Sequence, residues 1–443
     1  MSDHIHVIVI GAGVAGLAAA RRLTTAGLNV RIIEAQSRIG GRVYTQHDPL
    51  APLPIELGAE FIHGVPPQTW RIVDAAALPA VEQIGEQWWS QDGHLAHSGT
   101  FFDHVDQIME RLLADNGPDR SFSAFTDDQF GGNEWRAAVD HARTYVAGFD
   151  AADPDQISIK ALAKEQRASA DVSGDRNFHV LSGYDRVVHW LYGNCVAERI
   201  TLQLGTTVHT IHWEPGHVKV NVVTATGQLL DLIEADRAIV TLPLGVLQAS
   251  HALFQPPLPE KQAALEQLTM GHVVKIVLRF RRRWWEDQAL VGAPLDQLGF
   301  LLSNDPVMPT WWTTAPVRTP ILTGWVGGPR ASALADRDDL AILNEAFEAL
   351  ARILRIDRMA IEEQLDGWYI HNWQRDPFTR GAYSYVKVGG IDAPAALAAP
   401  VADTLFWAGE ATNTSGATGT VHGAIETGER AADEVLQVLG VGD

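Results

Sequence analysis

The residues near the start of the chain that could do chemistry are three glycines and one carboxylate. Gly11, Gly13 and Gly16 follow an apolar run and open a helical pattern, at the spacing of a turn whose backbone can approach a pyrophosphate. The helix N-terminus adds unpaired N–H groups and the positive end of its dipole. Glu34 ends a second apolar run, where a carboxylate can accept hydrogen bonds from ribose hydroxyls. The pattern predicts a dinucleotide site without choosing between NAD and FAD.

The composition limits the kinds of protein that the chain can be. With 443 residues it is long enough for two or three domains with their own cores. Its net charge of −20 argues against nucleic-acid or anionic-membrane binding, and is compatible with cationic substrates as well as with solubility alone. Cys195 is the single cysteine, and no apolar run reaches the roughly 20 residues of a membrane helix. We therefore expect a soluble cytoplasmic protein, a monomer or homodimer, with no nucleic-acid or membrane partner.

Helical and strand-like patterns alternate along the chain. After the first strand, turn and helix, residues 76–195 read mainly as helices. Short strands follow over 201–241 and 270–280, and a long helix over 337–354. Residues 404–443 return to strand, turn and helix, with one apolar helix face. The similar segments at both ends predict one nucleotide-binding domain built from both ends of the chain, with the central part inserted into it.

Further motifs, in order and over essentially the whole chain, resemble those of the FAD-dependent amine oxidase family. Within that family they look most similar to polyamine oxidases and the related histone-lysine demethylases, although no residues are available for the additional domains of the demethylases. The motifs are Gly40-Gly41-Arg42, Glu56 to Gly64, Trp373 with Asp376-Pro377, Arg380 to Tyr385, Gly409-Glu410 and Thr420 to Ala424.

The resemblance implies an α/β fold, with a Rossmann-like FAD-binding domain made of discontinuous segments and an inserted substrate domain of mixed sheet and helices. We assign residues 1–75, 196–250 and 401–443 to the FAD-binding domain. The substrate domain then comprises a helical part, 76–195, and a sheet part, 251–400.

The resemblance also implies which residues contact FAD. Val208 would meet adenine through its backbone, Trp373 would pack beside the isoalloxazine, and Glu410 would face the ribityl or pyrophosphate region. The N–H groups of Thr420 and Val421 would face the pyrimidine edge, where negative charge accumulates on reduction. No cysteine occupies the C-terminal position that binds flavin covalently in monoamine oxidases, so we expect non-covalent FAD. The full predicted set is Gly11, Gly13, Ala15, Gly16, Glu34, Ala35, Gly41, Arg42, Gly58, Ala59, Glu60, Val208, Trp373, Gly409, Glu410, Thr420 and Val421.

Lys275 and His63 are the predicted polar groups at the flavin. Taken by itself, Lys275 in the apolar strand Val-Val-Lys-Ile-Val would be expected on the solvent face. Its counterpart in the resembling family instead bonds through a water to the reactive flavin nitrogen, where a desolvated lysine can lose its charge near neutral pH. His63 resembles a histidine that faces the substrate and could accept or position a proton of the amine.

Tyr383 and Thr420 are the predicted channel walls. The face of the Tyr383 ring would favour an amine. Thr420 replaces one ring of the aromatic pair found in many members of the family, which disfavours the monoamine-oxidase subgroup. The tryptophan pairs at 88–89, 284–285 and 311–312 are expected in the core or the channel, without individual roles.

The resemblance implies an oxidase that removes a hydride from the carbon beside an amine nitrogen, with oxygen as the acceptor and a polyamine or other secondary amine as the substrate. A cyclic amine alkaloid of the hydroxynicotine type remains an alternative. An L-amino-acid oxidase would need an arginine clamp, for which Arg143, Arg167 and Arg380 remain open. A flavin-binding module without catalysis, or a desaturase-like enzyme, fits Lys275 and His63 poorly. No metal motif and no Gly-x-Ser-x-Gly elbow is present.

Overall fold

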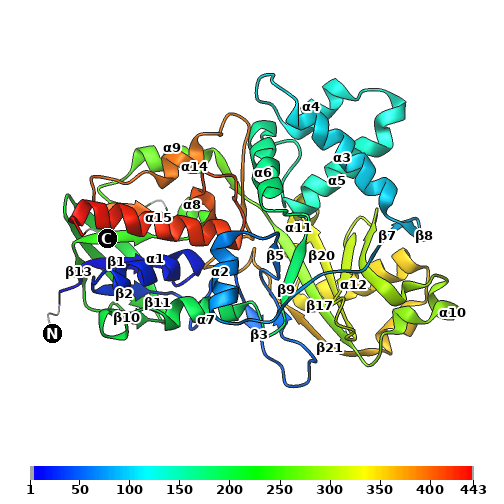
Figure 1. Cartoon of the computed structure of the whole chain (residues 1–443), viewed down its shortest axis with the longest axis horizontal. Helices are drawn as coiled ribbons and strands as arrows, with labels where there is room; N and C mark the ends of the chain where they lie inside the picture. The colour runs from blue at the N-terminus through cyan, green and yellow to red at the C-terminus, as the bar shows by residue number, and fades with distance from the viewer. Residues whose placement is uncertain (1–3, 251, 442–443) are drawn as a thin grey trace.

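The computed structural model of the chain describes residues 4–250 and 252–441. A five-stranded parallel sheet forms the centre of the part of the molecule drawn at the left of Figure 1. Its strands come from three distant segments of the chain, which confirms the discontinuous Rossmann-like domain, and the central strand β1 is buried throughout. In spatial order the strands are β10 (Ile200–Gln203), β2 (Val30–Ile33), β1 (Val7–Ile10), β14 (Arg237–Val240) and β23 (Leu405–Trp407).

Helices from the two ends of the chain lie side by side on one face of this sheet (Figure 1). They are α1 (Val14–Thr25) and α15 (Val421–Leu439), and buried apolar side chains such as Leu17 and Ile425 join them. A side chain at Gly428 of α15 would come within 2.2 Å of the backbone oxygen of Ala15, so the close approach of the helices requires glycine there.

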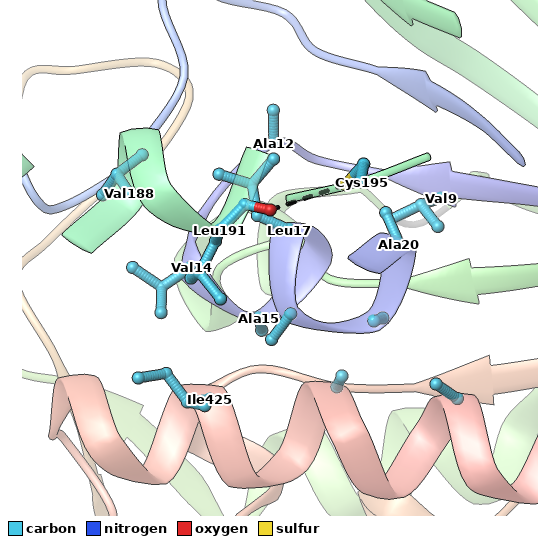
Figure 2. Close-up of a cluster of buried hydrophobic side chains, with 14 of the residues drawn as sticks. Val9, Ala12, Val14, Ala15, Leu17, Ala20, Val188, Leu191, Cys195 and Ile425 are labelled. Carbon is cyan, nitrogen blue, oxygen red and sulfur yellow. Dashed lines mark hydrogen bonds between the residues drawn. The ribbon is translucent and has the colours of Figure 1, made fainter. Parts of the chain in front are cut away.

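A third helix, α7 (Asp185–Gly193), packs against α1 in the same core. Figure 2 shows Cys195 in this cluster, where its Sγ donates a hydrogen bond to the backbone oxygen of Leu191 at 3.5 Å. The domain boundary at residue 195 stays a prediction. The packing of α7 against α1 favours a boundary before this helix.

A four-stranded sheet covers the opposite face of the parallel sheet, through apolar contacts that include Ile8, Val220 and Val240. Three helices lie beside it and pack on one another. The strands are β13 (Ile233–Ala235), β12 (His217–Thr224), β11 (Thr206–Glu214) and β15 (Phe254–Gln255), and the helices are α8 (Leu244–Ala249), α9 (Pro259–Glu266) and α14 (Ala393–Ala398).

A seven-stranded sheet forms the centre of the inserted region. Its strand β17, predicted over 270–280, begins at Val273 and is buried at every position, and α12, predicted from 337, begins at Asp339. Asp338 caps α12 by accepting a hydrogen bond from the N–H of Ala341. The strands in order are β21 (Leu365–Ile370), β17 (Val273–Phe280), β20 (Ile321–Gly327), β19 (Thr310–Thr313), β18 (Leu298–Ser303), β7 (Glu86–Gln91) and β8 (His94–His97), and α12 (Asp339–Leu354) packs on the sheet.

The stretch 76–195 was expected to be mainly helical, and this is only partly right. It contains α3 (Gly99–Leu113), α4 (Phe122–Gln129), α5 (Arg136–Phe149) and α6 (Ile159–Asp171), which share an apolar core. It also contains β7 and β8, which form a hairpin at the edge of the seven-stranded sheet. The hairpin turns at Asp92-Gly93, where both residues have positive φ angles, as a two-residue hairpin turn requires.

Two short sheets pair strands that are distant in the sequence. In one, β5 (Phe61–His63) and β6 (Ala80–Glu82) flank β9 (Asn177–Val180), and in the other β16 (Leu268–Met270) pairs with β22 (Ser384–Val386). Within the described part of the chain, none of the helices combines the length and apolar character needed to cross a bilayer.

Candidate active site

A cavity of about 1110 Å³ extends between the parallel sheet and the inserted region. Ligand pockets commonly measure about 300–1,000 Å³, so this cavity has room for a dinucleotide together with a second molecule. All but one of the predicted site residues line it: Gly11, Gly13, Ala15, Glu34, Ala35, Gly41, Arg42, Gly58, Ala59, Glu60, His63, Val208, Lys275, Trp373, Tyr383, Gly409, Glu410, Thr420 and Val421.

The glycine turn before α1 forms one end of the cavity. Gly11 has a φ of +108°, and a Cβ there would lie 2.6 Å from Oγ1 of Thr241. Gly16, the one predicted residue that does not line the cavity, serves packing, since its Cβ would lie 2.1 Å from the backbone oxygen of Gly11. Gly13 is the N-cap of α1, and the first turn of α1 carries no acidic residue. The N-terminal N–H groups are therefore left to an anion.

Glu34 lies at the end of β2 and is buried beside this turn. Its Oε2 accepts a hydrogen bond from the N–H of Ala12 at 2.7 Å, and its Oε1 accepts one from the N–H of Gln36 at 2.8 Å. Burial raises the pKa of Glu34, and these two hydrogen bonds oppose that effect. Each oxygen keeps a further lone pair, so the carboxylate is oriented for a ribose hydroxyl.

A second helix N-terminus lines the same cavity, at α15. Thr420 caps it by accepting a hydrogen bond from the N–H of Gly423 at 3.0 Å. The first turn again has no acidic residue. The channel-wall role predicted for Thr420 stays a prediction, because its hydroxyl also donates to the backbone oxygen of Ala417.

The side chains of Glu410 and Arg42 bond to other residues of the cavity wall. One oxygen of Glu410 pairs with Arg42 at 2.7 Å, and the other accepts hydrogen bonds from the hydroxyl and N–H of Ser384 and from the N–H of Gly419. Arg42 also donates to the backbone oxygen of Ala382. The predicted contacts of both residues with FAD stay predictions.

Trp373 is fixed against the segment that contains Gly58. Its Nε1 donates to the backbone oxygen of Leu57 at 2.9 Å, and a Cβ at Gly58 would lie 1.9 Å from the backbone oxygen of Arg42. The glycine turn, the two helix N-termini free of acidic residues and the oriented Glu34 fit a bound FAD.

Lys275 lies inside the cavity wall, so the solvent-facing interpretation of its strand is wrong. Its side chain is 2% exposed, and its Nζ lies 2.6 Å from Oε2 of Glu60. Oε1 of Glu60 accepts a hydrogen bond from Nε1 of Trp312 at 3.0 Å and lies 3.5 Å from Nδ1 of His179. Sequence reasoning placed Glu60 at the cofactor but missed its pairing with Lys275, because Glu60 precedes β5 and Lys275 lies on β17, far away in the chain.

His63 and Tyr383 both approach the C-terminal end of α5. Nδ1 of His63 lies 2.7 Å from Oδ1 of Asn177, and burial lowers the pKa of His63, so its imidazole is neutral near pH 7. The hydroxyl of Tyr383 donates to the backbone oxygen of Phe149 at 2.6 Å. His422 in the first turn of α15, missed from the sequence, also lines the cavity, and burial lowers its pKa to about 4.

The helical region adds carboxylates to the cavity that sequence reasoning did not single out. Asp106, Asp150 and Glu165 all line it, from α3, the C-cap of α5 and α6. Oδ2 of Asp150 is buried without a hydrogen-bond partner, and burial raises the pKa of Asp150 to about 7. Burial and the neighbouring Asp150 raise the pKa of Glu165 well above its ordinary value. Single carboxylates on separate helices leave no motif by which they could have been found.

The chain resembles curated proteins along nearly its whole length. It is 29% identical to polyamine oxidase 2 of Arabidopsis thaliana, over 97% of this chain and 87% of that protein. It is 27% identical to lysine-specific histone demethylase 2 of Homo sapiens, but spans only 53% of that longer protein. It spans 30% of the lysine-specific histone demethylase 1 homolog 3 of A. thaliana, at 28% identity.

Solved structures share the fold. Cyclohexylamine oxidase from Brevibacterium oxydans IH-35A superimposes with a TM-score of 0.80 at 20% identity, covering 99% of this chain and 100% of that one. Wild-type putrescine oxidase bound to putrescine gives a TM-score of 0.78 at 22% identity, covering 98% and 99%. The profile of the family described as flavin containing amine oxidoreductase matches residues 14–436. The chain therefore belongs to the flavin-containing amine oxidoreductases, and its cofactor is FAD.

Proposed function

We propose that this flavin amine oxidase acts on a polyamine or another secondary amine that carries more than one cationic nitrogen. A hydride leaves the carbon beside one nitrogen, and water hydrolyses the resulting imine to a carbonyl compound and an amine. When bound, FAD supplies the hydride acceptor and passes both electrons to oxygen, which becomes hydrogen peroxide. The polyamine oxidases among its relatives support this substrate class.

The observation that carries the proposal is the uncompensated carboxylate of Asp150. A buried carboxyl oxygen without a partner is unfavourable, and an ammonium group of the substrate would supply the missing hydrogen bond. Asp150 is also the C-cap of α5, where the negative end of the helix dipole favours a cation. Glu165 and Asp106 add two further carboxyl groups to the same cavity.

Aromatic side chains line the part of the cavity between these carboxyl groups and Lys275, where they would contact a cationic substrate. Tyr145 and Phe149 of α5 stack with their centroids 5.2 Å apart, and both line the cavity together with Tyr383. Ring faces attract an ammonium group and exclude water from the reacting carbon. The neutral imidazole of His63 can accept a proton from the substrate, which leaves the amine with the free lone pair that oxidation requires.

The acidic cavity disfavours an L-amino-acid substrate. Arg143 donates to Thr126 and the backbone of Ser123, and Arg167 donates to the backbone of Leu113, so neither arginine is aimed into the cavity. Arg380 lines the cavity, but the carboxyl groups of Asp150 and Glu165 line it as well and suit an ammonium group rather than a substrate carboxylate. A cyclic amine alkaloid remains the second candidate, since the aromatic walls suit a flat amine as well.

A peroxide-release screen of the holoenzyme tests the proposal. The panel comprises spermine, spermidine, N-acetylated polyamines, monoamines, amino acids and nicotine-type alkaloids, each with oxygen as the acceptor. We expect the highest kcat/KM with a substrate of two or more cationic nitrogens. A preference for an alkaloid would replace the proposed substrate class, and no peroxide from any amine, with bound FAD verified, would overturn the oxidase itself.

A further inference from the structure

The carboxylate of Glu60 contacts Lys275 with one oxygen and accepts a hydrogen bond from Trp312 with the other. Nζ of Lys275 lies 2.6 Å from one oxygen, and Nε1 of Trp312 donates to the other at 3.0 Å. Glu60 and Lys275 are both buried, at the inner wall of the cavity. A carboxylate held by this many donors keeps one orientation.

The hydrogen bonds of Lys275 leave part of the ammonium group unused. Nζ has three donors, of which Glu60 takes one and the backbone oxygen of Gly58 takes another at 3.2 Å. In the described part of the chain, no third acceptor lies within hydrogen-bonding distance of Nζ. The remaining N–H is therefore available to a group held in the cavity.

We propose that Glu60 is a positioning residue that keeps Lys275 protonated and directs its remaining N–H to the cofactor. The inference rests on the flavin lying against Lys275, as the proposed function requires. It replaces the expectation that burial lets this lysine lose its charge. The active site then contains a fixed ion pair. The ammonium group of Lys275 donates to the flavin, and the carboxylate of Glu60 keeps that ammonium group charged and oriented.

Desolvation explains why the lysine needs this partner. An ammonium group that is 2% exposed loses its proton readily unless an opposite charge holds it. Burial alone would raise the pKa of Glu60, but Lys275 and His179, with the hydrogen bonds from Lys275 and Trp312, hold that pKa below its ordinary value. Glu60 is therefore ionised at neutral pH and available as the counter-charge.

Two other titratable groups lie near the ion pair, and an experiment must distinguish their titration from the effect of the pair. His179 on β9 lies 3.5 Å from Glu60, and burial lowers its pKa, which leaves it neutral near pH 7. Glu56, on β4 (Ile55–Glu56), interacts electrostatically with both members of the pair, and burial raises its pKa to about 8. An experiment on Glu60 therefore compares variants that all retain His179 and Glu56.

The test measures the reduction potential of the bound flavin against pH in Glu60→Gln, by dithionite titration without any amine. In the wild type the pair has no net charge. In Glu60→Gln the protonated lysine adds one positive charge, so the potential lies above that of the wild type at low pH. The lysine then loses its proton as pH rises, and the two potentials converge. An offset that is absent, or constant with pH, would overturn the proposal.

Two matched variants separate charge from structure. Glu60→Asp keeps the charge and Trp312→Phe removes only a neutral hydrogen bond to it, so neither should give an offset that changes with pH. The double variant Glu60→Gln with Lys275→Met has no titrating amine and should also show none. A pH-dependent offset in the double variant would assign the titration to Glu56 or His179 and contradict the inference.

Flavin reoxidation gives a second measurement. We expect the rate in Glu60→Gln to fall about 10-fold as pH rises, to the level of Lys275→Met, while the wild-type rate changes little over the same range. If Glu60→Gln fails to retain flavin, NMR titration of the Lys275 side chain in the apoprotein replaces it, with a lowered lysine pKa expected and an unchanged one contradictory. Because the potential is measured without substrate, a wrong substrate assignment leaves this test intact.

Discussion

The two ends of the cavity differ in how their charges are compensated. At the cofactor end, Glu34 accepts hydrogen bonds from backbone N–H groups, Glu410 forms an ion pair with Arg42, and Glu60 forms one with Lys275. At the end lined by the helices, Asp150 has a buried oxygen with no hydrogen-bond partner, and burial raises the pKa of Glu165, which favours its neutral form. The first end is complete before any substrate arrives, whereas the second end becomes complete by binding a cation.

The largest expected effect is at the border of the completed end. Lys275→Met should retain flavin, because the glycine turn and the helix N-termini bind it, while flavin reoxidation or turnover slows at least ~10-fold. Glu60, left without its cation, becomes protonated. Flavin absorbance checks that the variant retains flavin, and stopped-flow reoxidation measures the slowing. Unchanged kinetics would mean that Lys275 takes no part in the reaction.

Lys261 provides the matched control for that experiment. It is also buried, but its Nζ donates to the backbone oxygens of Ala396 and Leu397 at the end of α14, outside the cavity lining. Lys261→Met should therefore lower thermal stability without slowing flavin reoxidation. An equal slowing in both variants would mean that loss of any buried lysine disturbs the fold.

The next effect is at the uncompensated end. Asp150→Asn removes the charge that would pair with a distal ammonium group, a contact between charged groups worth about 1.5–3 kcal/mol. We expect KM for a polyamine to rise about 10-fold or more, with little change for a monoamine. Asp155→Asn, the same change at an exposed position outside the cavity lining, is the control. Equal rises for polyamine and monoamine would contradict the assignment.

A smaller effect concerns stability against pH. Burial raises the pKa of Asp150 to about 7 from an ordinary value of 3.8, so the folded state favours the neutral acid. This stabilisation is fully present below the ordinary value and is lost as pH rises through about 7. Substrate-free Asp150→Asn should gain about 1 kcal/mol over the wild type between pH 6 and pH 7. Thermal unfolding of both holoenzymes measures it, and a difference that does not change with pH would count against a buried, uncompensated carboxyl.

The same contrast explains what could be predicted from the sequence. The cofactor end is built by short motifs, in which Gly11 and Gly13 are set by backbone geometry that any similar site needs, and both line the cavity. Asp150 and Glu165 were missed because a single carboxylate on a helix acquires meaning only when the tertiary fold buries it. Trp89 and Trp312, left without roles, line the cavity from strands of the seven-stranded sheet, and nothing local distinguishes them from core tryptophans.

The smallest expected effect tests whether the completed end needs a covalent bond to hold FAD. Cys195 is the single cysteine of the chain, and its thiol lies in the core between α1 and α7, bonded to Leu191 and outside the cavity lining (Figure 2). We expect denaturation to release all flavin from the wild type, and Cys195→Ala to bind flavin and turn over at the wild-type level. Flavin that stays with the denatured wild type but leaves the variant would contradict this. The cofactor end would then depend on a bond that its geometry does not require.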